Sequence, residues 1–219
     1  EGMRHRGAWS WGIACLLGLP CIAAAATLDV QVTDQNGQPV ADAVVTVLPP
    51  TAGAPNTHAT QHIIDQRQLT FIPYVEVFRP GDTVVFRNSD RTRHHVYSFS
   101  PAKSFEFVVA PGESAAPMVL DKTGVVAVGC NIHDGMIGYL YITDAPYFAR
   151  TDAHGRVAFD ALPAGRYEVR VWQPRLPPGR PDLREQSTTL SANEGKTLAF
   201  AVTLRPDPRR QFDREHTHY

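Results

Sequence analysis

The chain has 219 residues and a formal net charge of −1, with 21 Lys and Arg residues against 22 Asp and Glu residues. A chain of this length can bury a sizeable core in one or two domains. Because its charges nearly balance, no broad basic field suggests nucleic acid as a partner. The 18 Pro and 16 Gly residues, with many Val and Thr, predict short strands joined by turns and therefore an all-β protein.

The first residues have the pattern of an export signal. A short basic segment at residues 3–6 precedes an apolar run at residues 11–22, and Ala24-Ala25-Ala26 follows. We therefore predict a signal peptide over residues 1–26 and a periplasmic protein of the Gram-negative type. The apolar run is too short for a good membrane span, so none is expected after cleavage. Lipid attachment at Cys21 is the weaker alternative.

Cleavage of the signal changes the number of cysteines. Cys15 and Cys21 leave with it, and Cys130 is the single cysteine of the exported chain. An unpaired thiol in an oxidising compartment is prone to oxidation or mispairing unless something holds it. A bound metal is the simplest explanation, and a buried inert cysteine is the alternative.

The exported chain begins with two predicted strands. Residues 27–33 alternate apolar and polar side chains, which predicts a half-buried strand. Residues 34–37 predict a turn, and residues 43–48 predict a second strand that ends at Pro49-Pro50. Residues 51–62 are small and polar and predict a loop.

A denser series of strands follows from Leu69. Residues 75–78 and 83–88 predict a hairpin around the turn Arg79-Pro80-Gly81-Asp82. Further strands are predicted at residues 94–99, 104–109, 117–120, 124–128 and 137–143. About eight strands over roughly 75 residues are typical of a β-sandwich or barrel.

The last part of the chain, like the first, is predicted to form strands that are separated by turns and longer loops. Strands are predicted at residues 156–159, 166–172, 187–190 and 197–204, with a Pro- and Arg-rich loop over residues 173–187. Residues 205–219 are charged and polar and predict a flexible tail.

Both ends of the chain resemble the carboxypeptidase-regulatory-like, transthyretin-like β-sandwich. The resemblance rests on residues 32–43, 151–155 and 162–167. In that family these segments are separated only by a short loop, whereas about a hundred residues intervene here. We therefore predict a discontinuous sandwich of residues 27–52 and 146–204, with a second domain inserted at residues 65–145. Two sequential domains are the alternative.

One short loop carries three metal-binding side chains. Cys130, His133 and Met136 follow one another at a spacing of three. Thiolate and thioether are soft ligands that favour Cu(I), and a Cys and two His with a weak axial Met form the ligand set of blue-copper electron-transfer sites. The second histidine must come from elsewhere, and His94 or His95 is available, since neighbouring strand residues face opposite ways. Zinc is the alternative metal, but a thioether and a single thiol do not favour it.

Residues 71–143 resemble the cupredoxins. The resemblance rests on residues 80–88, 94–96 and 130–136, in that order, and the compact ligand loop is similar to that of amicyanin-like members. On residues 94–100 and 129–134, the whole chain also resembles the cupredoxin-domain proteins called methylamine utilisation proteins, which carry similar stretches. The implied fold is a Greek-key β-sandwich, and the implied ligands of one mononuclear copper ion are His94, Cys130, His133 and Met136. His94 is preferred to His95 because His94-His95-Val96 matches the family's usual His-Asn-Val.

The function implied by this resemblance is the transfer of single electrons by Cu(I)/Cu(II). The expected partner is a redox protein such as a c-type cytochrome or a periplasmic dehydrogenase. The sequence contains no nucleophile elbow, phosphate-binding Gly loop or dinucleotide fingerprint, so no enzyme activity is expected. Two alternatives stay open: a copper-binding or delivery protein without electron transfer, and a structural or adhesive β-module with a vestigial metal site.

Overall fold

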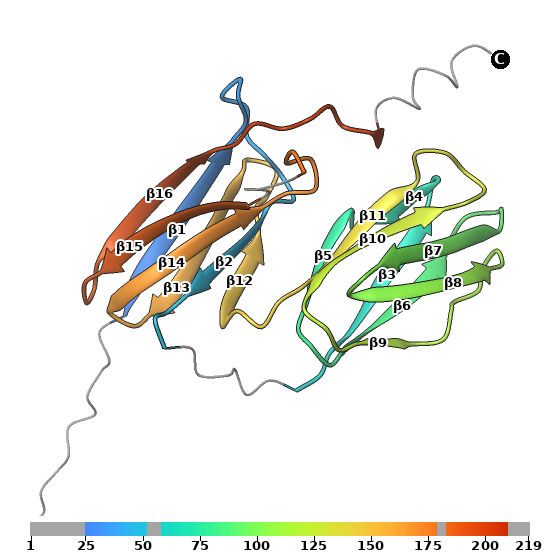
Figure 1. Ribbon diagram of the computed structural model, residues 1–219, viewed down its shortest axis with the longest axis horizontal. Coiled ribbons are helices and arrows are strands. Elements are labelled where there is room, and N and C mark those ends of the chain that lie inside the picture. The colour runs from blue at the N-terminus through green and yellow to red at the C-terminus, as the bar shows by residue number, and fades with distance from the viewer. Residues whose placement is uncertain (1–24, 52–57, 179–182, 210–219) are drawn as a thin grey trace, which may run out of the picture.

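The computed structural model describes residues 25–51, 58–178 and 183–209, which contain sixteen β-strands in four sheets (Figure 1). The predicted all-β class is therefore confirmed. None of the helices in these ranges has the length and apolarity needed to cross a lipid bilayer. Residues 1–24 of the predicted signal peptide and residues 210–219 of the predicted tail lie outside the described residues.

Strands from both ends of the chain form the first sandwich. Its three-stranded sheet has the order β13-β1-β16, with β1 at Ala26–Thr33, β13 at Arg156–Leu162 and β16 at Gly195–Ala201. Its four-stranded sheet has the order β12-β2-β14-β15, with β2 at Val44–Leu48, β12 at Tyr147–Arg150, β14 at Gly165–Trp172 and β15 at Leu183–Leu190. One buried core joins the two sheets, with Val30 and Val45 packed among Phe159, Val171 and Leu190. Segments far apart in the sequence therefore share one core.

The middle of the chain forms the second sandwich, β3 to β11. One sheet has the order β4-β3-β6-β9, with β3 at Gln61–Arg67, β4 at Thr70–Ile72, β6 at Asp82–Asn88 and β9 at Met118–Leu120. The other has the order β5-β11-β10-β7-β8, with β5 at Val75–Phe78, β7 at His94–Ser100, β8 at Lys103–Val109, β10 at Gly124–Cys130 and β11 at Ile137–Ile142. Their shared core includes Phe86, Val96, Val126, Cys130 and Leu140. Cys130 thus belongs to a packed interior.

The predicted hairpin over residues 75–88 is wrong. Its turn forms, because the backbone N–H of Asp82 donates to the carbonyl of Arg79 at 3.1 Å and Gly81 adopts a φ of +99°. The strands on either side do not pair with each other: β5 runs parallel to β11, and β6 runs parallel to β3. The turn carries the chain from one sheet to the other. A turn motif specifies a change of direction but does not specify the pairing partner.

Several strands differ from the sequence-based expectation. β3 begins at Gln61, inside the predicted loop of residues 51–62 and ahead of the predicted domain boundary at residue 65. β12 occupies a segment for which no strand is predicted, and β15 begins inside the predicted loop of residues 173–187. These strands are polar or short, and they form because neighbouring strands supply their hydrogen bonds. For β3 those neighbours are β4 and β6.

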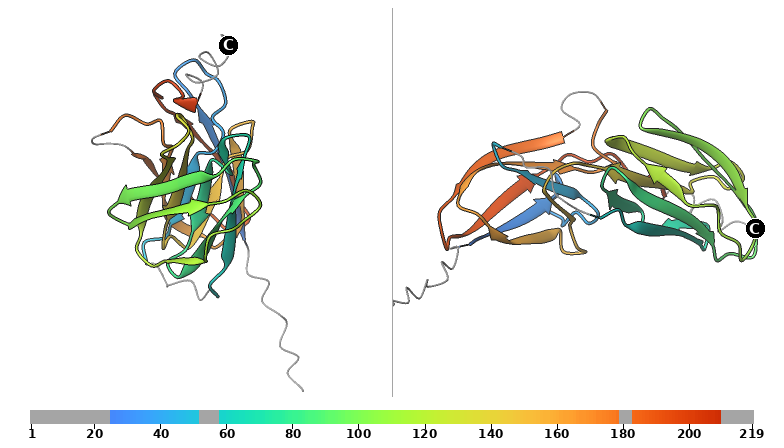
Figure 2. Two further views of the ribbon diagram at one scale, coloured as in Figure 1. Left: turned by 90° about the vertical axis from the view of Figure 1, so that its right-hand side faces the viewer. Right: turned by 90° about the horizontal axis from the view of Figure 1, so that it is seen from below.

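The two sandwiches lie next to each other (Figures 1 and 2). An apolar cluster joins them, in which Val44 and Trp172 of the first sandwich pack with Tyr74, Val75 and Val77 of the second. The ring of Trp172 lies 5.9 Å from that of Tyr139 and 5.0 Å from that of Tyr141, both on β11. Arg150 of β12 adds an ion pair across the junction, to Glu76 of β5 at 3.5 Å. Apolar burial at this junction therefore links the first sandwich to the sheet that contains β10 and β11.

Trp172→Ala is expected to destabilise the protein by about 3 kcal/mol, because it removes a buried indole from the junction cluster. Urea or thermal unfolding followed by circular dichroism measures this change. Phe99→Ala is the matched control, because Phe99 is 74% exposed and its removal is expected to cost under about 1 kcal/mol. Equal losses in the two variants would contradict the assignment of Trp172 to a packed junction.

His62 links the two sheets of the second sandwich by charge. Its Nδ1 lies 3.0 Å from a carboxylate oxygen of Glu76, and its Nε2 lies 3.5 Å from one of Asp82. The hydrogen bond to Glu76, acting against burial, raises the pKa of His62 above its usual 6.5, and Asp82 adds to the effect. His62 lies in the predicted loop of residues 51–62, and the structure instead places it on β3 between two carboxylates.

The raised pKa of His62 predicts a pH-dependent stability. Below about pH 6.5 the folded and unfolded chains both carry the proton, so the contribution is fully present. It is lost as the pH rises through the folded pKa. Because the site is partly exposed, the loss between about pH 6 and pH 9 is expected to be at most about 1 kcal/mol. Urea unfolding of the wild type and of His62→Gln across this range measures it, and parallel pH curves for the two proteins would refute it.

Candidate metal centre

The pairing of β7 with β10 brings two of the predicted ligands together. The strands run antiparallel, with Cys130 opposite Val96, and the backbone N–H of Asn131 donates to the carbonyl of His95 at 3.0 Å. Alternate residues of β7 face the core, so His94 and Val96 are fully buried. His94 and Cys130 therefore lie on the same, core-facing side of the sheet.

A short loop between β10 and β11 carries the third predicted ligand, His133. The backbone N–H of Cys130 donates to the carbonyl of Met136 at 3.2 Å, which closes the loop over residues 131–135. Gly135 adopts a φ of +71°, a conformation that glycine adopts without strain. His133 projects from this loop and is half-buried, so its imidazole reaches both the site and the surface.

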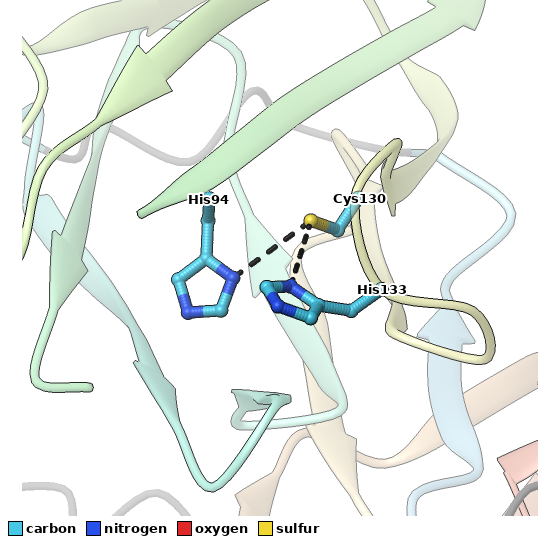
Figure 3. Close-up of side chains that lie close together, drawn as sticks. All are labelled: His94, Cys130 and His133. Carbon is cyan, nitrogen blue, oxygen red and sulfur yellow. Dashed lines mark hydrogen bonds between the residues drawn. The ribbon is translucent and has the colours of Figure 1, made fainter. Parts of the chain in front are cut away.

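Three donor atoms converge at this end of the second sandwich (Figure 3). The Sγ of Cys130 lies 3.8 Å from Nδ1 of His94 and 3.6 Å from Nδ1 of His133. Three ligand atoms, one from each residue, all lie within 4.8 Å of one another, and the imidazole centroids are 4.9 Å apart. The side chains come from β7, the end of β10 and the loop that follows it, and the dashed lines in Figure 3 meet at the sulfur.

These separations fit a single metal ion. With metal–sulfur and metal–nitrogen distances of ~2.3 Å and ~2.0 Å, a tetrahedral angle places sulfur and nitrogen ~3.5 Å apart, and a trigonal angle places them ~3.7 Å apart. The two distances from Cys130 in the structure are 3.6 Å and 3.8 Å. The two distances from the sulfur therefore fit a metal ion bound between Cys130 and each histidine.

The protonation of the site also suits a metal. Burial lowers the pKa of His133, and the neighbouring His94 lowers it further. His133 is therefore neutral at neutral pH and has a lone pair available for a metal. Cys130 is a free cysteine and is 8% exposed, so solvent has little access to its sulfur.

The structure places His95 away from this cluster. Neighbouring strand residues face opposite sides of a sheet, and the side chain of His95 points away from the core. Its Nε2 pairs with a carboxylate oxygen of Glu106 at 2.8 Å, and its Nδ1 lies 3.5 Å from the side-chain amide of Asn131. Of the two adjacent histidines, His94 is the one that lies beside Cys130.

Met136 lies at the end of the same loop, beside Cys130 in the backbone. It is 3% exposed and belongs to the same buried core as Cys130. Its carbonyl is fixed by the hydrogen bond from the backbone of Cys130. The backbone therefore holds Met136 close to the three donors, and its role as an axial ligand stays a prediction.

Sequence reasoning missed Asp90. A carboxylate oxygen of Asp90 lies 3.0 Å from Nε2 of His94, the ring nitrogen that faces away from Cys130. The signal in the sequence is weak, because Asp90 lies four residues before His94 in a polar turn that also contains other charged residues.

Comparison with known proteins finds similarity to cupredoxins over less than half of the chain. No protein-family model matches the chain, and no curated protein matches it. A Cu-containing nitrite reductase from Thermus scotoductus SA-01 is 22% identical over 43% of this chain and 25% of its own, with a TM-score of 0.36. A reduced amicyanin variant is 14% identical over 45% of this chain and 99% of its own, with a TM-score of 0.36. A purple cupredoxin from Nitrosopumilus maritimus is 21% identical over 38% of this chain and 99% of its own, with a TM-score of 0.33.

Of these solved structures, the nitrite reductase is named as Cu-containing and the protein from Nitrosopumilus maritimus is named as a cupredoxin. The chain spans a quarter of the length of the nitrite reductase that it matches. The predicted resemblance to cupredoxins agrees with these neighbours.

Proposed function

We propose that this protein is a periplasmic type 1 copper protein that carries single electrons between redox partners, and that it is not an enzyme. The observation that supports it best is the thiol of Cys130 with the Nδ1 atoms of His133 and His94 at 3.6 Å and 3.8 Å. One thiolate with two imidazoles, and a thioether nearby, is the donor set of blue-copper sites. Copper(II) also binds nitrogen and sulfur donors more tightly than the other common divalent metals do.

Bound copper would supply a one-electron couple, and the protein's part is to hold its ligands still. His94 and Cys130 lie on paired strands in a packed core, at 0% and 8% exposure. Their positions are therefore set by the sheet rather than by the metal. A site whose ligands barely move when the charge on the metal changes has a small reorganisation energy, which favours rapid electron transfer.

A partner would meet the molecule at the loop that carries His133. His133 is half-buried, and its neighbour Ile132 is 45% exposed. Val108, which pairs with His95 at the same end of the sheet, is 60% exposed. Small apolar surfaces of this kind suit brief contacts with a redox protein, such as a c-type cytochrome or a periplasmic dehydrogenase.

The same proposal includes the rest of the chain. The first sandwich, formed by both ends of the chain, would be a carboxypeptidase-regulatory-like domain, with the copper domain inserted between its second strand and the strands that follow. The sharing of one core by β1, β2 and β12 to β16 supports this organisation. Export would follow from the signal sequence at residues 1–26.

Copper binding or delivery without electron transfer is the second candidate. The half-exposed His133 favours it, because solvent or a carrier molecule can approach the site at this residue. Delivery requires copper that leaves readily, whereas an electron carrier retains its copper in both oxidation states. The two functions therefore differ in the lability of copper and in reversible electrochemistry.

The copper-loaded, oxidised protein is expected to show an intense visible absorption band from thiolate-to-copper charge transfer, and one reversible voltammetric wave. Cys130→Ser should abolish the band, because a hydroxyl is a hard and weak ligand for copper. The metal-free variant should still fold. Weak visible absorption with easily removed copper would favour delivery instead, and unchanged copper binding in Cys130→Ser would exclude Cys130 as a ligand.

Ile132→Lys is expected to slow electron self-exchange between oxidised and reduced copies by about tenfold, because it places like charges opposite each other when two such faces meet. NMR line broadening in partly oxidised samples measures this rate. Val119→Lys is the control, since Val119 is 49% exposed and lies on β9 in the other sheet. Equal slowing in both variants would place the contact surface elsewhere.

A further inference from the structure

Asp90 contacts the ring nitrogen of His94 that faces away from Cys130. Its Oδ2 lies 3.0 Å from Nε2 of His94, and the exposed fractions of the two side chains are 13% and 0%. The other ring nitrogen, Nδ1, faces the sulfur of Cys130. A neutral imidazole carries one N–H, and an ionised carboxylate can only accept. The contact therefore places the proton of His94 on Nε2 and the lone pair on Nδ1, toward the metal site.

Asp90 is itself fixed by two backbone donors. The N–H of Gln68 donates to Oδ1 at 2.6 Å, and the N–H of Leu69 donates to Oδ2 at 3.1 Å. Hydrogen bonds to a charged acceptor are shorter and stronger than neutral ones. With His94 as the third donor, the carboxylate has little freedom to rotate away from the imidazole.

The two donors come from a turn with an unfavourable backbone. Gln68 and Leu69 form the two-residue connection between β3 and β4, with φ angles of +54° and +56°. Such turns strongly prefer Asn and Gly, and longer side chains are strained there. In this conformation both amides bond Asp90. The bonds to the carboxylate therefore offset strain that the sequence of the turn would otherwise impose.

Asn88 holds Asp90 from the other side. Asn88 is 1% exposed, and its Oδ1 accepts from the backbone N–H of Asp90 at 2.9 Å. Its side-chain amide donates to the carbonyls of Thr92 at 2.8 Å and Val109 at 3.0 Å. The loop between β6 and β7 is thereby fastened to the end of β8. The carboxylate is oriented both by its own loop and by the β3–β4 turn.

We propose that Asp90 is a positioning residue of the metal site: it fixes the Nε2-protonated form of His94 and lowers the reduction potential of the copper. A carboxylate bonded to the far nitrogen makes an imidazole a stronger electron donor. A stronger donor stabilises Cu(II) more than Cu(I). This inference rests on the proposed function for its effect on the potential, whereas the protonation of His94 does not depend on copper.

The metal-free wild type gives the first test. Nitrogen-15 NMR of the histidine side chains distinguishes a proton on Nε2 from one on Nδ1. We expect His94 to carry it on Nε2, and a proton on Nδ1 would overturn the inference whatever metal the site binds. This measurement needs no variant to fold. A protein with the expected protonation but no charge-transfer band and no reversible wave would refute the proposed function alone.

Asp90→Asn gives the second test. An amide has similar size but no charge, and only one of its two ends can accept, whereas the carboxylate accepts N–H groups at both oxygens. We expect the affinity for Cu(II) to fall by about 10- to 100-fold and the reduction potential to rise. Competition with a chelator of known affinity and protein voltammetry measure the two effects. The metal-free variant should also show a larger share of His94 protonated on Nδ1.

Asp134→Asn is the matched control. Asp134 is an exposed carboxylate in the ligand loop, one residue after His133, so the substitution removes the same charge near the metal without removing a partner of His94. We expect a clearly smaller rise in potential and no change in the protonation of His94. Equal shifts in the two variants, with His94 unchanged in both, would show that Asp90 acts only through its charge and would overturn its role in positioning.

Discussion

The site depends on the register in which β10 pairs with β7. Cys130 lies opposite Val96, and the N–H of Asn131 bonds the carbonyl of His95, so the end of β10 is fixed against the start of β7. Side chains alternate along a strand, and a slip of one residue would turn Cys130 toward the face that His95 occupies. Packing prevents such a slip, because it would move the buried residues of β10 out of the core. The hydrophobic interior therefore sets the distance between the sulfur and His94.

Part of the arrangement of the site can be predicted from the sequence, because that part depends only on residues close together along the chain. The spacing of Cys130, His133 and Met136 is local, and a tight loop brings their backbone together whatever the rest of the fold does. The alternation of side chains along β7 is local too, but the sequence does not show which alternate residues face the core. His95 was therefore an alternative to His94 as the ligand, and the resemblance to a family decided the preference for His94. In the structure, the pairing of β7 with β10 determines that His94 faces the core and His95 does not.

Other features could not be predicted from the sequence, because they depend on pairing between segments that are far apart along the chain. The turn at residues 79–82 forms as predicted, but its two strands enter different sheets. The sequence of β3 is mostly polar and does not predict a strand. The strand forms because β4 and β6 pair with it on either side. Asp90 is the clearest case for the site. Its contact with His94 is close in sequence, but the donors that fix it come from the β3–β4 turn, and nothing local to Asp90 indicates that turn.

The two histidines of the site consequently have different surroundings. His94 is fully buried, and its far nitrogen is bonded to a carboxylate that two backbone N–H groups also hold. His133 lies on a loop, is half-buried, and has a lowered pKa because burial and His94 both disfavour its charged form. A ligand whose far nitrogen is hydrogen-bonded to a fixed carboxylate keeps its position with or without a metal. A ligand at the surface, in contrast, can be approached by another molecule. Electrons or copper would therefore enter and leave at His133, and the character of the metal would be set mainly by Cys130 and by the pair of His94 with Asp90.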